Sequence, residues 1–140
     1  MIHNYKILVV DDELDITSML KRYLELEDFK VDVCNDPVQA LELIKQKNYK
    51  ILITDLMMPN MSGIELIKEA KLFNGLIQVV VITGYVTSEN IILAFKHGAN
   101  NCIFKPFKNM EMIKQEIEQA INKLERIFQV LNEKLKLQRD

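Results

Sequence analysis

The chain has 140 residues, 49% of them hydrophobic and 27% charged, which is the composition of one folded domain and excludes a disordered segment. Eighteen basic against twenty acidic residues give a net charge of -2, which argues against direct nucleic-acid binding driven by positive charge. No apolar run approaches the roughly 20 residues of a membrane-spanning helix, and residues 1–6 lack a signal-peptide core, so we expect a cytoplasmic protein with no membrane contact.

Short runs rich in β-branched residues alternate with segments that have apolar residues at helical spacing. In chain order the pattern predicts a strand at 6–10, a helix at 14–26, a strand at 31–34, a helix after Asp36, a strand at 51–53, a helix at 62–73, a strand at 78–82, a helix from 87 or 88 to Gly98, a strand at 101–104 and a helix from Asn109 to about Gln138. In the helix after Asp36 we expect four residues to face inward: Val38, Ala40, Leu41 and Ile44.

Five strands alternating with five helices predict an α/β fold, a doubly wound parallel sheet with helices on both faces. In such folds the chemistry lies at the carboxyl ends of the strands. Those ends carry Asp11 and Asp12 after the first strand, Asp55 after the third, Thr83 after the fourth and Lys105 after the fifth. Each residue alone could be a solvated loop residue or a helix cap, but together they indicate a site for metal or phosphoryl chemistry.

Three clustered carboxylates repel one another, so they require a cation, and oxygen-only ligands favour Mg²⁺. With Asp11, Asp12 and Asp55 ionised, one Mg²⁺ and the Lys105 ammonium bring the resting charge of the site to zero. Phosphorylation of Asp55 would add about one negative charge, which calls for hydrogen-bond donors such as the Thr83 hydroxyl and the amides after Asp55.

Four motifs carry a family resemblance: the acidic pair after the first strand, Asp55-Leu56-Met57-Met58-Pro59 with Gly63 following, Thr83-Gly84, and Lys105-Pro106-Phe107. In this order and spacing, the chain from about Lys6 to Ile121 resembles the CheY-like receiver domain of two-component response regulators. The resemblance implies the strand order 2-1-3-4-5.

The resemblance also implies roles for single residues. Asp55 would take a phosphoryl group from a phosphohistidine, and Thr83 and Lys105 would hold the phosphoryl oxygens. Asp12, Asp55 and the Met57 carbonyl would bind Mg²⁺ directly, with Asp11 acting through water. A cis peptide bond is implied before Pro106. The partner would be a sensor histidine kinase or a histidine phosphotransfer protein.

Three positions are expected to modulate the site. Receivers usually carry an aromatic residue three positions before the lysine, where this chain has Cys102, so the usual link between the threonine and the output surface is altered. Met57 and Tyr85 flank the path of water, and neither can orient a water molecule. We therefore expect slow self-dephosphorylation, over minutes or longer.

The last helix is too long for the sheet. Roughly 29 residues span about 43 Å, whereas a five-residue strand spans about 17 Å. We therefore divide the chain into a receiver domain at 1–122 and a helical extension at 123–140. Alternating steps of four and three residues predict a coiled-coil seam at Leu124, Phe128, Leu131 and Leu135. The extension could form a homodimer, bind a partner, fold back on its domain, fray, or begin a linker.

The leading hypothesis is a phosphorylation-operated switch that accepts its own phosphoryl group and is not an enzyme in the turnover sense. A receiver fold that works only as an interaction or dimerisation module is the alternative. A Mg²⁺-dependent phosphohydrolase is less favoured because it requires Asp-x-Asp after the first strand, where this chain has Asp11-Asp12-Glu13. Nucleotide binding is disfavoured because no glycine-rich loop follows that strand.

Overall fold

A computed structural model of the chain describes residues 4–84 and 86–139. Within these residues, five parallel strands form one sheet of order β2-β1-β3-β4-β5, flanked by five helices, which confirms the predicted fold class and strand order. The elements are β1 (Lys6–Val10), α1 (Leu14–Leu26), β2 (Lys30–Cys34), α2 (Pro37–Gln46), β3 (Ile51–Thr54), α3 (Gly63–Phe73), β4 (Gln78–Thr83), α4 (Ser88–Lys96), β5 (Ala99–Phe104) and α5 (Glu111–Arg139).

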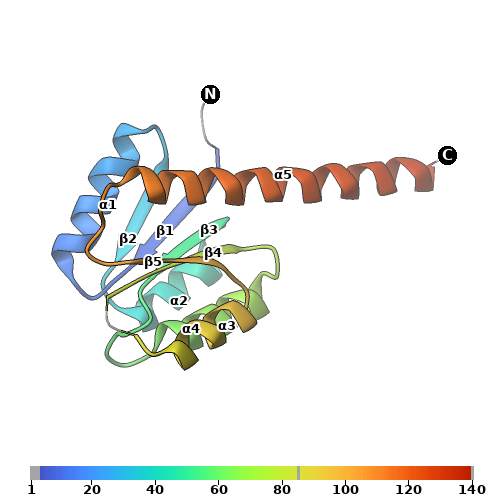
Figure 1. Cartoon of the computed structure of the whole chain (residues 1–140). Coiled ribbons are helices and arrows are strands. Elements are labelled where there is room, and N and C mark those ends of the chain that lie inside the picture. The colour runs from blue at the N-terminus through green and yellow to red at the C-terminus, as the bar shows by residue number, and fades with distance from the viewer. Residues whose placement is uncertain (1–3, 85, 140) are drawn as a thin grey trace.

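The sheet separates two apolar cores. Helices α1 and α5 cover one face, and α2, α3 and α4 cover the other (Figure 1). Successive residues of a strand point to opposite faces. On β1, Ile7 and Val9 therefore enter the first core, while Leu8 and Val10 enter the second. Because both faces are covered, the central strands β1, β3 and β4 consist mainly of apolar residues.

Helices α2, α3 and α4 each begin with a side-chain cap, in which Asp36, Ser62 and Thr87 accept a hydrogen bond from the backbone amide three residues later. The prediction that Val38 faces inward is wrong. Its side chain is exposed, because the inward stripe of α2 consists of Pro37, Ala40, Leu41 and Ile44, and position 38 lies about 100° around the helix from Pro37.

Strands β2 and β5 begin earlier than predicted, at Lys30 and Ala99, because pairing with the neighbouring strand extends to these residues. Gly98 ends α4 with φ = 110°, as its place after the helix predicted.

Helix α5 projects beyond the sheet (Figure 1). Its first half buries Ile113, Ile117, Ala120 and Ile121 against the α1 side, as predicted. The sequence places Leu124 in the projecting stripe, but the structure buries it completely, since it follows Ile117 by seven residues on the same helix face. Residues 129–138, which we call the arm, are exposed. No helix among the described residues is both long and apolar enough to cross a membrane.

Candidate functional site

The site lies where the parallel ladder ends. Asp55 continues β3 by donating its backbone amide to the Val10 carbonyl at 3.0 Å, and Lys105 continues β5 by donating its amide to the Thr83 carbonyl at 2.8 Å. Asp11 follows β1 in the same way, with its amide 3.2 Å from the carbonyl of Cys34. The strand register therefore brings these residues to one edge of the sheet, as the sequence predicts.

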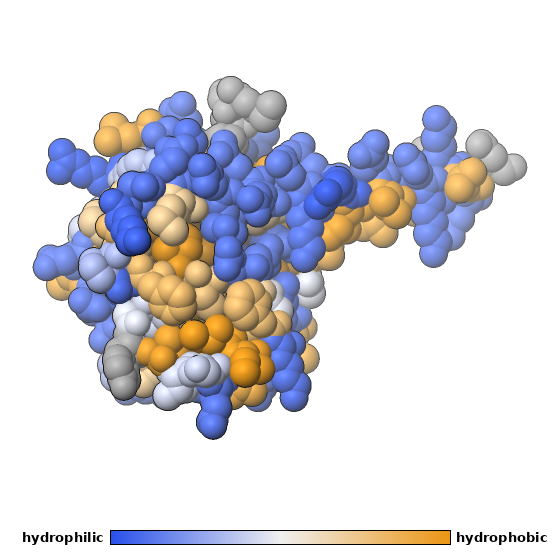
Figure 2. Space-filling model, in the orientation of Figure 1, coloured by the Kyte–Doolittle hydropathy of each residue, from blue (hydrophilic) through white to orange (hydrophobic). Residues whose placement is uncertain are grey.

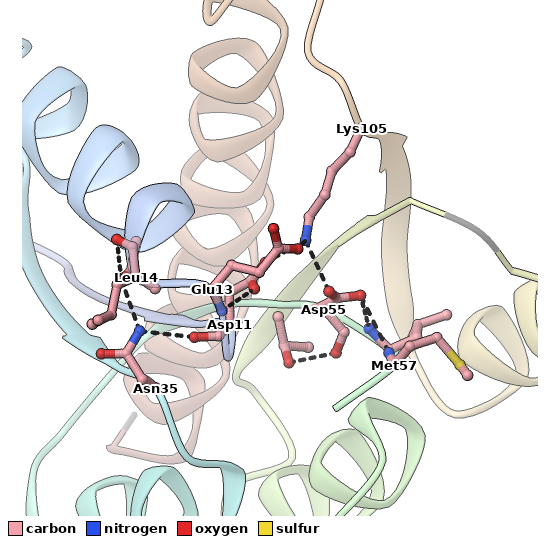
Figure 3. Close-up of polar contacts among 10 residues, drawn as sticks. Asp11, Glu13, Leu14, Asn35, Asp55, Met57 and Lys105 are labelled. Carbon is pink, nitrogen blue, oxygen red and sulfur yellow. Dashed lines mark hydrogen bonds and ion pairs between the residues drawn. The ribbon is translucent and has the colours of Figure 1, made fainter. Parts of the chain in front are cut away.

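The Lys105 ammonium forms ion pairs with three carboxylates, and Figure 3 shows the residues involved. Its Nζ lies 2.6 Å from Asp11 Oδ2, 2.9 Å from Asp55 Oδ2 and 3.1 Å from Glu13 Oε1. Asp11 is completely buried, and this burial raises the pKa of its carboxyl although Lys105 opposes the shift. Burial would lower the pKa of Lys105, but its hydrogen bonds with Asp11 and Asp55 outweigh this effect and raise it. Lys105 is therefore protonated and positively charged at neutral pH.

Backbone amides fix the other oxygen of Asp55. Its Oδ1 accepts hydrogen bonds from the amides of Leu56 at 2.6 Å and Met57 at 3.2 Å. Gly63 closes the loop by donating its amide to the Leu56 carbonyl at 2.9 Å. A Cβ at position 63 would lie 2.0 Å from the Asp55 carbonyl oxygen, so only glycine fits. The glycine of the motif thus positions Asp55.

The acidic side chains are arranged to hold a divalent cation. Asp11, Asp12 and Asp55 each offer a carboxylate oxygen, and these atoms all lie within 4.8 Å of one another. Asp12 is exposed, whereas the other two are buried, so a cation would enter from the Asp12 side. The donor set consists of hard oxygen ligands of the kind that bind Mg²⁺.

The Thr83 hydroxyl is buried and has no hydrogen-bond partner among the described residues. Buried hydroxyls are nearly always paired, so this unpaired hydroxyl, on the residue whose carbonyl accepts the Lys105 amide, is free to bind an incoming acceptor. Met57, whose carbonyl is the remaining predicted metal ligand, follows Asp55 in the same loop and exposes its side chain. The peptide bond between Lys105 and Pro106 is cis, as the resemblance implied.

Cys102 is half-buried on β5 and packs against the core that α2, α3 and α4 cover. Burial raises the pKa of its thiol, which favours a packing role over a reactive one. Tyr85 lies outside the described residues.

Two residues make polar contacts that were not predicted. The sequence placed Glu13 at the end of β1 without a role, yet its side chain contacts Lys105. Asn35 donates its side-chain amide to the Asp11 carbonyl and to Thr17 Oγ1, both at 2.9 Å, and so braces the loop after β1. A single asparagine after a strand is typical of any turn, so no sequence signal distinguished it.

Comparisons with known proteins agree with this geometry. The family model described as the response regulator receiver domain matches residues 7–118. A homolog of the transcriptional regulatory protein CpxR from Haemophilus influenzae is 35% identical over 108 residues, which cover 77% of this chain and 47% of that protein. The transcriptional regulatory protein ZraR of Klebsiella oxytoca is 36% identical over 71% of this chain and 23% of its own length. The chain thus spans less than half the length of these relatives.

Among solved structures, a receiver domain protein from Clostridium thermocellum has a TM-score of 0.83 and 30% identity, with 88% of this chain and 98% of that chain covered. A structure described as adenylate cyclase from Rhodopirellula baltica also has a TM-score of 0.83, at 28% identity, and covers 99% of both chains. The second match therefore extends over nearly all of α5.

Proposed function

This chain belongs to the family of response regulator receiver domains, and from that premise we propose that Asp55 accepts a phosphoryl group from a phosphohistidine donor in a Mg²⁺-dependent reaction. An Asp55 carboxylate oxygen attacks phosphorus, the new O–P bond forms as the P–N bond breaks, and the electron pair stays on the imidazole nitrogen. The ion pair between the Asp55 carboxylate and the Lys105 ammonium, together with the unpaired Thr83 hydroxyl at the end of the intervening strand β4, carries this proposal.

Each residue has a part that follows from its contacts. The Lys105 ammonium and the Thr83 hydroxyl hold phosphoryl oxygens, and the amides of Leu56 and Met57 keep Asp55 oriented. Receiver domains generally use Mg²⁺, which here would be held by Asp12, Asp55 and the Met57 carbonyl, with Asp11 acting through water. When bound, it supplies the positive charge that offsets the charge of the phosphoryl group.

The chain is proposed to act on itself only, and so not to be an enzyme with turnover. The Met57 side chain is exposed beside Asp55 and has neither a carboxylate nor an amide to orient water. We therefore expect the phosphorylated chain to last for minutes or longer, with Tyr85 as the second flanking residue. A Met57→Asn variant should lose its phosphoryl group faster, as measured by intact mass after donor removal. An unchanged or longer lifetime would contradict this role for Met57.

The donor is proposed to be a sensor histidine kinase or a histidine phosphotransfer protein in the cytoplasm. Both cysteines, Cys34 and Cys102, are free thiols, as expected in a reducing compartment. DNA binding by relatives is not carried over, because this chain spans less than half of their length.

The output is proposed to be a protein–protein contact. Apolar side chains gather over α4 and β5 and along the projecting part of α5 (Figure 2). On α4 and β5 the exposed residues include Ile92, Phe95 and Phe104. On the arm, Val130, Leu131, Leu135 and Leu137 are exposed, and such a stripe favours burial against a second copy. The arm has only about three turns, so an arm dimer would be weak and would need support from the domain face.

The test is incubation with acetyl phosphate, with and without Mg²⁺, followed by intact mass measurement and a sizing column. We expect a Mg²⁺-dependent gain of one phosphoryl group, absent from Asp55→Asn, and an earlier elution if phosphorylation drives dimerisation. As a matched control, Asp15→Asn removes an exposed carboxylate from the nearby first turn of α1 and should be phosphorylated like the wild type. A folded wild-type chain that gains no mass would refute the phosphoacceptor function and favour a phosphorylation-independent interaction module.

A further inference from the structure

Glu13 occupies a helix cap position without capping the helix. Its backbone is extended, with φ = -87° and ψ = 114°, and its carbonyl accepts the first amides of α1, from Ile16 at 3.1 Å and Thr17 at 3.3 Å. The Glu13 carboxylate makes no capping bond, whereas the side chains at the starts of α2, α3 and α4 all do. Glutamate is not a favoured residue at this position. Helix capping therefore does not explain the position of the side chain.

The carboxylate points instead to Lys105, with Oε1 3.1 Å from Nζ (Figure 3). Three carboxylates crowd this ammonium. Lys105 donates hydrogen bonds to Asp55 and Glu13, and its Nζ also forms an ion pair with Asp11 Oδ2 at 2.6 Å. A phosphoryl oxygen on Asp55 would be a further acceptor around an ammonium that has only three protons, so it competes with the partners already in place.

The three carboxylate partners differ in how much free energy it costs each of them to separate from Lys105. Asp11 is completely buried, so without Lys105 its charge would stay unpaired in a low-dielectric environment. Asp55 carries the phosphoryl group and stays beside the lysine in either state. The Glu13 side chain is 60% exposed, so water can take the place of the ammonium at little cost. Glu13 is therefore the partner that can leave.

We propose that Glu13 is the exchangeable partner of Lys105: it accepts a hydrogen bond from the ammonium in the resting state and is displaced by the phosphoryl group on Asp55. This inference rests on the proposed phosphoacceptor function. It assigns to Glu13 a positioning role, in which the residue competes with the phosphoryl group and thereby weakens the active state. Because a ligand shifts an equilibrium only by its differential affinity for the two states, removing the competitor should tighten binding of a phosphoryl group.

The probe is beryllofluoride, a phosphoryl analogue that activates a related receiver with a TM-score of 0.80 to this chain. Equilibrium binding is measured by titration of the full chain in the presence of Mg²⁺, so the readout is affinity and not a reaction rate. An exposed ion pair of this kind predicts that Glu13→Gln binds beryllofluoride about two- to fivefold more tightly than the wild type.

Two matched variants separate contact from charge. Glu13→Asp keeps the charge but withdraws the carboxylate by one methylene, so it should also bind more tightly than the wild type. Asp15→Asn removes one charge from the first turn of the same helix without touching Lys105, so its affinity should equal that of the wild type. Circular dichroism of each variant confirms that α1 is intact.

The outcomes are distinct. Tighter binding by both Glu13 variants, with Asp15→Asn unchanged, supports the exchange. The exchange is refuted if Glu13→Gln binds like the wild type, if Glu13→Asp behaves like the wild type while Glu13→Gln binds tighter, or if Asp15→Asn gains as much as Glu13→Gln. A wild-type chain that neither binds beryllofluoride nor gains mass from acetyl phosphate would instead refute the phosphoacceptor function itself.

Discussion

The acidic site should destabilise the chain when no divalent cation is present, and Asp12→Asn should relieve this. The carboxylate oxygens of Asp11, Asp12 and Asp55 lie within 4.8 Å of one another. At that distance two unit charges repel by about 0.9 kcal/mol even in water, and Asp12 faces two such neighbours. Lys105 offsets part of this repulsion, although its ammonium already pairs with Asp11, Glu13 and Asp55. We expect a net gain of about 1 kcal/mol in the free energy of unfolding for Asp12→Asn.

Thermal unfolding at low ionic strength measures this gain. In EDTA, Asp12→Asn should unfold about 3 °C higher than the wild type. Mg²⁺ should then raise the Tm of the wild type, because it binds only the folded site, and should raise that of the variant far less. Asp15→Asn serves as the charge control and should follow the wild type in both buffers. A variant that is less stable than the wild type in EDTA, or that keeps the full Mg²⁺ response, would refute this account of the site.

Three further changes test how the fold supports the site. Gly63→Ala should lower the free energy of unfolding by about 2 kcal/mol or more in urea, because the new Cβ would meet the Asp55 carbonyl at 2.0 Å; a neutral change would refute the close approach. Leu124→Ala should lower the free energy of unfolding by about 3 kcal/mol and Leu131→Ala by under about 0.5 kcal/mol, since only Leu124 is buried. Equal losses would contradict this placement of the two residues along α5. Tyr49→Phe should lower the free energy of unfolding by about 1 kcal/mol at pH 7, because the Tyr49 hydroxyl donates a hydrogen bond to the partly exposed carboxylate of Asp32 and lowers the pKa of that carboxyl. A lowered folded-state pKa stabilises the folded chain at pH values above the unfolded-state pKa of about 3.9, and this stabilisation is lost as the pH falls through the folded-state pKa. In urea titrations the difference in free energy of unfolding between Tyr49→Phe and wild type should therefore shrink below about pH 4. A difference that does not change with pH would contradict this role of Tyr49.

Much of the fold was predictable because local patterns specify it. The β-branched runs predicted the five strands, and the alternation with helices predicted a parallel sheet, because parallel strands require crossover connections. The bounds of α1 and the start of α2 after Asp36 were also predicted, and the start of α4 to within one residue, since helix starts depend on neighbouring residues alone. The outward direction of Val38 was not predicted, because the inward face of a helix is defined only by what packs against it.

For the site, the order of the motifs located Asp55, Thr83 and Lys105, since the carboxyl ends of parallel strands must meet at one edge. Which carboxylates the lysine contacts could not be inferred, because Glu13 and Lys105 are 92 residues apart in sequence and their contact depends on the angle at which α1 leaves β1. The unpaired hydroxyl of Thr83 is likewise invisible in a sequence, since it is a property of everything that surrounds one atom. Residue types and their periodicity thus sufficed for the fold and for the chemistry of the site, whereas the partners of each charge, and the competition between them, arise from distances that only the packed chain defines.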